Sequence, residues 1–205
     1  MTNRPEFAST QFEYLLKGAL SKEGTEIREA AVPLSCVRLF DTNMMSKVLK
    51  ATKPGIYKSW NIADFGDLLY KFRNSGLLVR EKGYAVDSAV RHLVSEHLRY
   101  NEPKMFTKAN LAALEVYREW LSRPVDSRSL YVVEELFHVA NLDPQADLTG
   151  LLKGRLEEYP RWYRDTIEHQ IQVDNLGQLL RDDIELESLT SSLPEMMELV
   201  KKYKP

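Results

Sequence analysis

Three neighbouring side chains, His92, Glu96 and His97, are of the types that bind zinc or transfer protons. A zinc site on one helix needs its two histidines at positions i and i+4, so that both rings leave the same face. His92 and His97 are five residues apart, which turns the second ring about 140° round a helix from the first. We therefore expect two partly exposed helix histidines here, and no metal site.

A second pair, Glu135 and His138, has the i, i+3 spacing of di-iron ligands. Such a site also needs another Glu-x-x-His pair and two more carboxylates on facing helices, whereas Glu168 and His169 are adjacent. We expect Glu135 or His138 to make a polar contact between helices. An all-α metal enzyme built on this pair is the least favoured of three interpretations.

The remaining clusters of acidic residues, at 157–158 and 182–185, are typical of charged helix surfaces. No other residues converge on them as an acid–base pair would require. The chain contains no phosphate-binding loop G-x-x-x-x-G-K-[ST], no G-x-G-x-x-G, no G-x-S-x-G and no C-x-x-C. We therefore expect neither an enzyme nor a bound cofactor.

The composition is that of an ordinary globular protein: 205 residues, 43% hydrophobic, 28% charged and a net charge of −2. A nearly neutral chain has no overall attraction to nucleic acids or acidic membranes. The single cysteine, Cys36, lies in the apolar run VPLSCVRLF, which predicts a buried side chain and a reducing, cytoplasmic location. The sequence contains no stretch of about 18 apolar residues, so we predict no membrane span.

Helical periodicity dominates the chain. Helices are predicted at residues 12–20, 25–39, 44–51, 61–75, 88–101, 105–121, 130–141, 148–159, 162–180 and 195–203. Polar residues are expected as N-caps of four of them, namely Thr25, Asp41 or Thr42, Asn61 and Asp87. Only residues 77–80 and 84–86 read as strands, and Glu81-Lys82-Gly83 between them predicts a tight turn.

Residues 25–102 thus follow the order of a winged helix, three helices followed by a β-hairpin and a further helix. We expect a mainly α fold with an N-terminal helical extension (1–24), this winged-helix domain (25–102) and an α-helical hairpin domain (103–205). In the third helix of the winged helix, the side chains expected to face the core are Ile62, Phe65, Leu68, Leu69 and Phe72.

A winged helix raises the possibility of DNA binding, with the third helix in the major groove. The outward residues expected on that helix carry mixed charge, among them Asp67 and Lys71. The segment before it is basic and aromatic. If the chain binds DNA, the contacts are expected from Lys53, Lys58, Arg73, Arg80 and Lys82.

Four runs resemble the winged-helix and following helical region of the signal-transducing P-loop ATPases with numerous domains, the STAND class. The first two are REAAVPLSCVRLFDTNMMSKVLKA and DLLYKFRNSGLLVREKGYAVDSAVRHLVSEHL, and the next are FTKANLAALEVYREWL and SLYVVEELFHVANL. They cover a little over half of the chain. The family's nucleotide-binding domain has no counterpart in the sequence, so the resemblance implies a part of a larger protein.

The resemblance also implies site residues. The family's motif after the wing, Tyr-x-Φ-His-x-x-Φ-Arg (Φ, apolar), is matched here by Tyr84, Val86, Val90 and Arg91, with Asp87 in place of the histidine that faces the nucleotide. A carboxylate would repel phosphate, so Asp87 is not expected to be a nucleotide ligand. Arg91, Asp87 and Tyr84 are the expected contacts to a neighbouring domain or protein partner.

Two functions remain open. The favoured one is a non-catalytic regulatory part of a STAND-type ATPase, which relays the state of a neighbouring domain as a rigid body. The alternative is a winged-helix DNA-binding regulator with a helical dimerisation domain.

Overall fold

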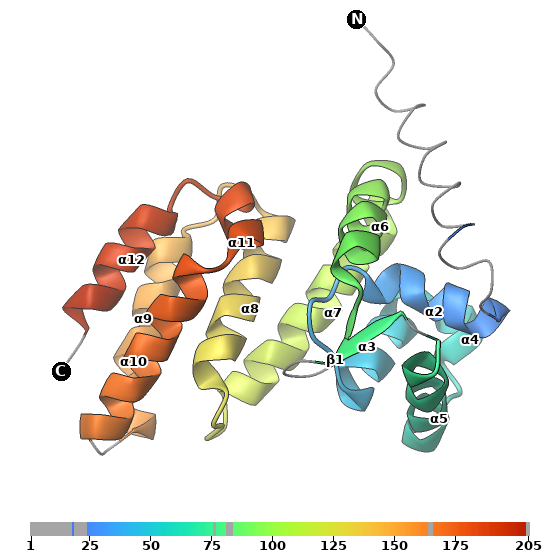
Figure 1. Ribbon diagram of the computed structural model, residues 1–205, viewed down its shortest axis with the longest axis horizontal. Coiled ribbons are helices and arrows are strands. Elements are labelled where there is room, and N and C mark those ends of the chain that lie inside the picture. The colour runs from blue at the N-terminus through green and yellow to red at the C-terminus, as the bar shows by residue number, and fades with distance from the viewer. Residues whose placement is uncertain (1–17, 19–23, 76, 81–83, 164–165, 204–205) are drawn as a thin grey trace, which may run out of the picture. The chain divides into compact units, whose positions relative to one another are not determined.

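The computed structural model describes residues 18, 24–75, 77–80, 84–163 and 166–203 (Figure 1). It divides into two compact units, Met1–Ala113 and Leu114–Pro205, which we call the N-terminal unit and the C-terminal unit. The described residues are mainly helical, as predicted. None of the described helices is long and apolar enough to cross a membrane. The helix predicted at 12–20 lies, except for residue 18, outside the described residues.

Three helices of the N-terminal unit pack on one another, and a short fourth one connects the last two of them (Figure 1). They are α2 (Thr25–Leu34), α3 (Thr42–Thr52), α4 (Pro54–Tyr57) and α5 (Ile62–Arg73). Their shared core contains Leu34, Met44, Val48, Leu68 and Phe72, all fully buried. Helix α4 was not predicted, because Pro54 and Gly55 read as a turn.

Helix α2 ends at Leu34, so the prediction of one helix over 25–39 is wrong. After Pro33 the backbone tightens into i→i+3 hydrogen bonds, from the N–H of Cys36 to Pro33 and from that of Val37 to Leu34. The Ser35 hydroxyl donates to the carbonyl of Ala31 at 2.8 Å. These bonds close the helix and allow Phe40 to leave in an extended conformation.

The two strands are β1 (Leu78–Arg80) and β2 (Tyr84–Val86), and they pair antiparallel with Val79 opposite Ala85. Residues 81–83 between them lie outside the described residues. The pairing extends on both sides. The Asp87 N–H donates to the carbonyl of Leu77 at 2.8 Å, and Phe40 forms an antiparallel bridge with Tyr84 on the other edge of β2.

Acidic or amide side chains begin the main helices of this unit. Asp41 accepts a hydrogen bond of 2.8 Å from the N–H of Met44 at the start of α3. Asn61 and Asp64 form a reciprocal capping box at the start of α5. Asp87 accepts from two N–H groups at the start of α6 (Ser88–Asn101), which leads into α7 (Pro103–Leu121). The predicted caps Asp41, Asn61 and Asp87 are confirmed. The cap predicted at Thr25 is wrong, since Thr25 is the first residue of α2 and Gly24 precedes it without a side-chain hydrogen bond.

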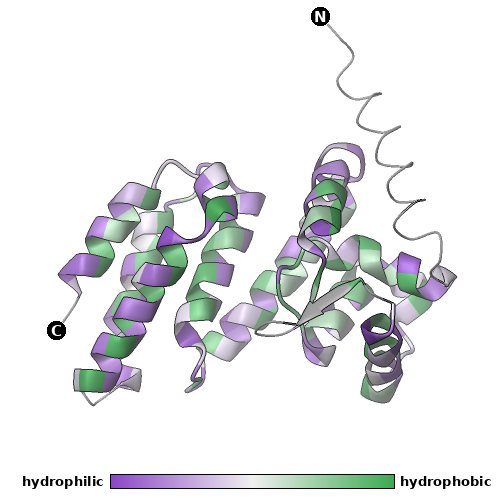
Figure 2. Cartoon of the chain, viewed as in Figure 1, coloured by the Kyte–Doolittle hydropathy of each residue, from purple (hydrophilic) through white to green (hydrophobic). Residues whose placement is uncertain are grey.

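In the C-terminal unit, α8 (Arg128–Leu142), α9 (Leu148–Trp162), α12 (Leu193–Lys202) and α10 (Thr166–Arg181) form a ring. Each packs on the next, and α10 packs back on α8 (Figure 1). Helix α11 (Ile184–Leu189) packs on α8. Apolar and polar residues are interspersed along each of these helices (Figure 2). The buried apolar side chains form one core that includes Val132, Leu136, Leu152, Leu156, Leu176 and Met196.

Two predicted boundaries in this unit are wrong. Pro160 was expected to end α9, but the helix continues to Trp162, because a proline in the last turn interrupts only one hydrogen bond. The predicted helix 162–180 begins instead at Thr166, since Trp162 belongs to α9. Helix α11 was not predicted, because its six residues are too few to show a helical period.

Replacing the cap of α5 tests how that helix is held. We expect Asn61→Ala to lower the free energy of unfolding by about 1 kcal/mol, because two N–H groups lose their acceptor. Asn74→Ala, at the exposed C-terminal end of the same helix, should change it by less than about 0.5 kcal/mol. Urea unfolding followed by circular dichroism measures both, and equal losses would contradict the capping role.

Candidate functional site

The three residues expected to contact a partner lie around β2. Asp87 is occupied as the N-cap of α6. The guanidinium carbon of Arg73, from α5, lies 5.9 Å from the centre of the Tyr84 ring, within range of a cation–π contact. Arg91 is only 7% exposed, with its charge close enough to influence Cys36 inside the unit. The structure therefore brings Tyr84 together with Arg73, a residue predicted for DNA binding.

Cys36 is buried, as predicted, with 2% of its surface exposed. Burial raises the pKa of its thiol to about 12, although the nearby charges of Arg99 and Arg91 and a hydrogen bond with Ser95 act in the opposite direction. The thiol therefore stays protonated at neutral pH and is not an activated nucleophile.

The basic residues predicted for DNA binding are in different situations. Lys53 forms an ion pair with Glu29 of α2. Lys58 and Arg73 are exposed. The side chain of Arg80 and all of Lys82 lie outside the described residues. Near them, Lys71 of α5 is paired with Glu26 at 2.6 Å. Two of the cations beside α5 are thus partly neutralised by α2.

Glu135 makes the polar contact between helices that its spacing predicted. Its carboxylate is 1% exposed and accepts hydrogen bonds from Arg118 of α7 at 3.0 Å and from Arg155 of α9 at 2.7 and 2.9 Å. The hydrogen bonding of Arg155 to the Glu135 carboxylate raises the pKa of the Arg155 guanidinium. Two guanidinium groups at this carboxylate would repel a metal cation. No group of three or more potential metal ligands occurs among the described residues.

The same network continues to a fully buried arginine that the sequence did not reveal. Arg155 donates to Glu158 at 3.1 Å, and Glu158 accepts from Arg128 at 2.6 Å. Arg128 also donates to the carbonyl of Leu121 at the end of α7, and its guanidinium lies 4.8 Å from the Trp162 ring centre. The only signal in the sequence is the i, i+3 spacing of Arg155 and Glu158.

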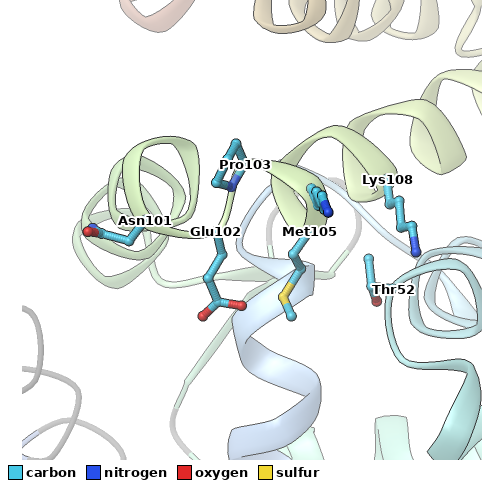
Figure 3. A pocket seen from close by; sticks show the side chains of 7 residues that line it. Thr52, Asn101, Glu102, Pro103, Met105 and Lys108 are labelled. Carbon is cyan, nitrogen blue, oxygen red and sulfur yellow. The ribbon is translucent and has the colours of Figure 1, made fainter.

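A cavity of about 430 Å³ lies beside the turn between α6 and α7 (Figure 3). Its lining side chains are Thr52, Asn101, Glu102, Pro103, Lys104, Met105 and Lys108. Glu102 is the one carboxylate among them, and the lining contains no histidine. The Thr52 hydroxyl donates to the carbonyl of Val48 at 2.7 Å. The described residues that line the cavity thus include no carboxylate–histidine pair.

Helix α5 of the N-terminal unit exposes two large apolar side chains on one side. Ile62 and Tyr70 are 61% and 66% exposed, although Ile62 was predicted to face the core. Ile62 is the first residue of α5, and its side chain is not part of the buried apolar face formed by Phe65, Leu68 and Phe72. A Cβ at Gly66, one turn from each, would meet no atom within 4 Å. We call Ile62, Gly66, Tyr70 and Arg73 the α5 face, and regard it as the candidate functional site.

No family model, curated protein or solved structure matches the chain.

Removing Glu135 tests the buried network. We expect Glu135→Ala to lower the free energy of unfolding by about 3 kcal/mol, because the largely buried Arg155 loses its hydrogen bonds to Glu135 and keeps only Glu158 as a counter-charge. The half-exposed Arg118 remains solvated and adds little to this loss. Glu119→Ala removes an exposed pair with Arg123 and should cost less than about 1 kcal/mol. Chemical denaturation of both variants provides the comparison, and similar losses would show that Glu135 contributes no more than a surface charge.

Proposed function

We propose that residues 25–102 form a winged helix and that the chain acts as a non-catalytic module that binds a protein partner. The fold proposal is supported by the order of α2, α3, α5, β1 and β2. It is also supported by Phe40, which lies between the first two helices and pairs with β2.

The observation that carries the functional proposal is the character of the α5 face. In a DNA-binding winged helix, this helix enters the major groove and its surroundings contact phosphates, which calls for unpaired cations. Here two large apolar side chains are exposed on it, and Lys71 and Lys53 are paired with glutamates of α2. Exposed apolar and aromatic side chains are typical of protein–protein contacts.

The resemblance to STAND ATPases supports a more specific version. The partner would then be a nucleotide-binding domain, and the chain would relay its state to other regions by rotating as a rigid body. Tyr84 beside Arg73 continues the α5 face towards β2, where Asp87 and Arg91 also lie. If the partner binds α5 and β2 together, Tyr84 would lie in the interface, and Asp87 and Arg91 would lie in it or directly behind it.

Site-specific crosslinking tests the protein-binding proposal. A photoreactive phenylalanine analogue at Tyr70 should give a covalent protein adduct in the cells that make the chain, because this position lies in the α5 face. Tyr100, 76% exposed on α6, is the matched control and should give little adduct. Denaturing gels and mass spectrometry identify the products. Nucleic-acid adducts at position 70, or equal yields at both positions, would contradict the proposal.

DNA binding is the second candidate, because the N-terminal unit as a whole is basic. Residues 1–113 contain 17 Lys and Arg against 12 Asp and Glu. Lys58 and Arg73 are exposed near α5, and Arg80 and Lys82 lie close to them in the sequence. An excess of positive charge favours phosphate contacts even where individual cations are paired.

Fluorescence anisotropy with duplex DNA at increasing salt separates the two functions. If the α5 face binds protein, we expect no measurable affinity at physiological salt. A DNA-binding protein would instead show a steep salt dependence, and Lys58→Ala or Arg73→Ala would each reduce the slope of log K against log salt by about 1. That second result would favour the DNA-binding alternative.

A further inference from the structure

The two units carry net charges of opposite sign. The N-terminal unit has 17 basic and 12 acidic residues, a net charge of +5, whereas the C-terminal unit has 11 basic and 18 acidic residues, a net charge of −7. The near-neutral total conceals this difference. Opposite charges on two surfaces raise the rate at which they meet and disfavour contacts between like surfaces.

The acidic C-terminal unit has an apolar helix face of its own. Ile167 and Ile171, one turn apart on α10, are 72% and 51% exposed. Glu168 and Asp174 are exposed on the same helix. The opposite side of α10 packs on α8 and α12. We call Ile167, Ile171 and Asp174 the α10 face.

The α5 face offers an open space and an exposed basic residue. Gly66 leaves an open space one turn from Ile62 and one turn from Tyr70. One isoleucine from a second helix can enter such a space, as a knob of one helix enters a hole between side chains of the facing helix. Arg73 at the end of the face is exposed and basic, opposite in sign to Asp174 and Glu168.

We propose that the partner of the α5 face is the α10 face of a second copy of this chain. This inference rests on the proposed function, because it uses the same docking surface. Contact between two α5 faces would bring two units of +5 together, so charge favours the unlike pairing. A contact between two different surfaces is heterologous and continues into a ring or a linear array unless it is capped.

Sedimentation velocity of the full chain at several concentrations tests the inference. We expect association at low salt that weakens as the Debye length falls from about 10 Å at 0.1 M to about 3 Å at 1 M. Gly66→Leu fills the open space, and Ile171→Glu places a charge in the α10 face. Each should weaken association at least tenfold.

Gly154→Leu is the matched control. Gly154, like Gly66, is a helical glycine with no atom within 4 Å of its Cβ position, but it is exposed on α9, outside both faces. Association should remain as in the parent chain. Because a Cβ at Gly66 or Gly154 would meet no atom within 4 Å, leucine at either position should leave the fold intact, which circular dichroism and thermal unfolding verify.

Mixing the two variants gives the decisive result. Gly66→Leu retains an intact α10 face and Ile171→Glu retains an intact α5 face, so the mixture should form a dimer that neither forms alone. A chain that stays monomeric at low salt, or one whose association ignores both substitutions, overturns the inference. If the crosslink at position 70 then identifies a different protein, the proposed function stands without self-association.

Discussion

The arrangement of the N-terminal unit depends on one pair of backbone hydrogen bonds. The N–H of Phe40 donates to the carbonyl of Tyr84 at 2.8 Å, and the N–H of Tyr84 donates back at 3.3 Å. Phe40 directly precedes Asp41, the cap of α3, and Tyr84 lies three residues before Asp87, the cap of α6. The bridge therefore fixes where two helices begin. It also places the Tyr84 ring beside Arg73, which connects the strands to the α5 face.

The C-terminal unit is organised differently, because its helices are joined by buried charge as well as by apolar packing. Glu135 and Arg128 are almost completely buried, and ion pairs connect them through Arg155 and Glu158. Desolvation makes such pairs poor sources of stability compared with apolar side chains of similar size. These ion pairs restrict how the helices can be arranged, because a carboxylate between two guanidinium groups keeps its hydrogen bonds in few arrangements of α7, α8 and α9. An apolar contact would tolerate many more.

The sequence predicts those parts of this structure that depend on local chemistry. Asp41, Asn61 and Asp87 were recognisable as caps because a cap needs only a polar side chain before an apolar period. Contacts between distant segments could not be predicted in this way. No local pattern predicts that Phe40 pairs with Tyr84. The spacing of apolar residues, taken alone, led to the prediction that α2 extends to residue 39. Likewise, the period placed Ile62 in the core, whereas its position at the first residue of α5 leaves it exposed.

The glycines of the helices show what distinguishes the α5 face from an ordinary surface. Glycine within a helix costs about 1 kcal/mol relative to alanine. Gly177 lies against another helix, because a Cβ there would come to 3.4 Å from Val200 of α12, at contact distance. Gly66 and Gly154 have no such neighbour. Since both positions share this open space, the space by itself does not identify a binding surface. One turn away, however, Gly154 has Gly150 and Glu158, whereas Gly66 has two large apolar side chains that water surrounds. Among the described glycines of α5, α9 and α10, apolar exposure and an open space coincide at Gly66. Together they favour a surface that another helix can pack against.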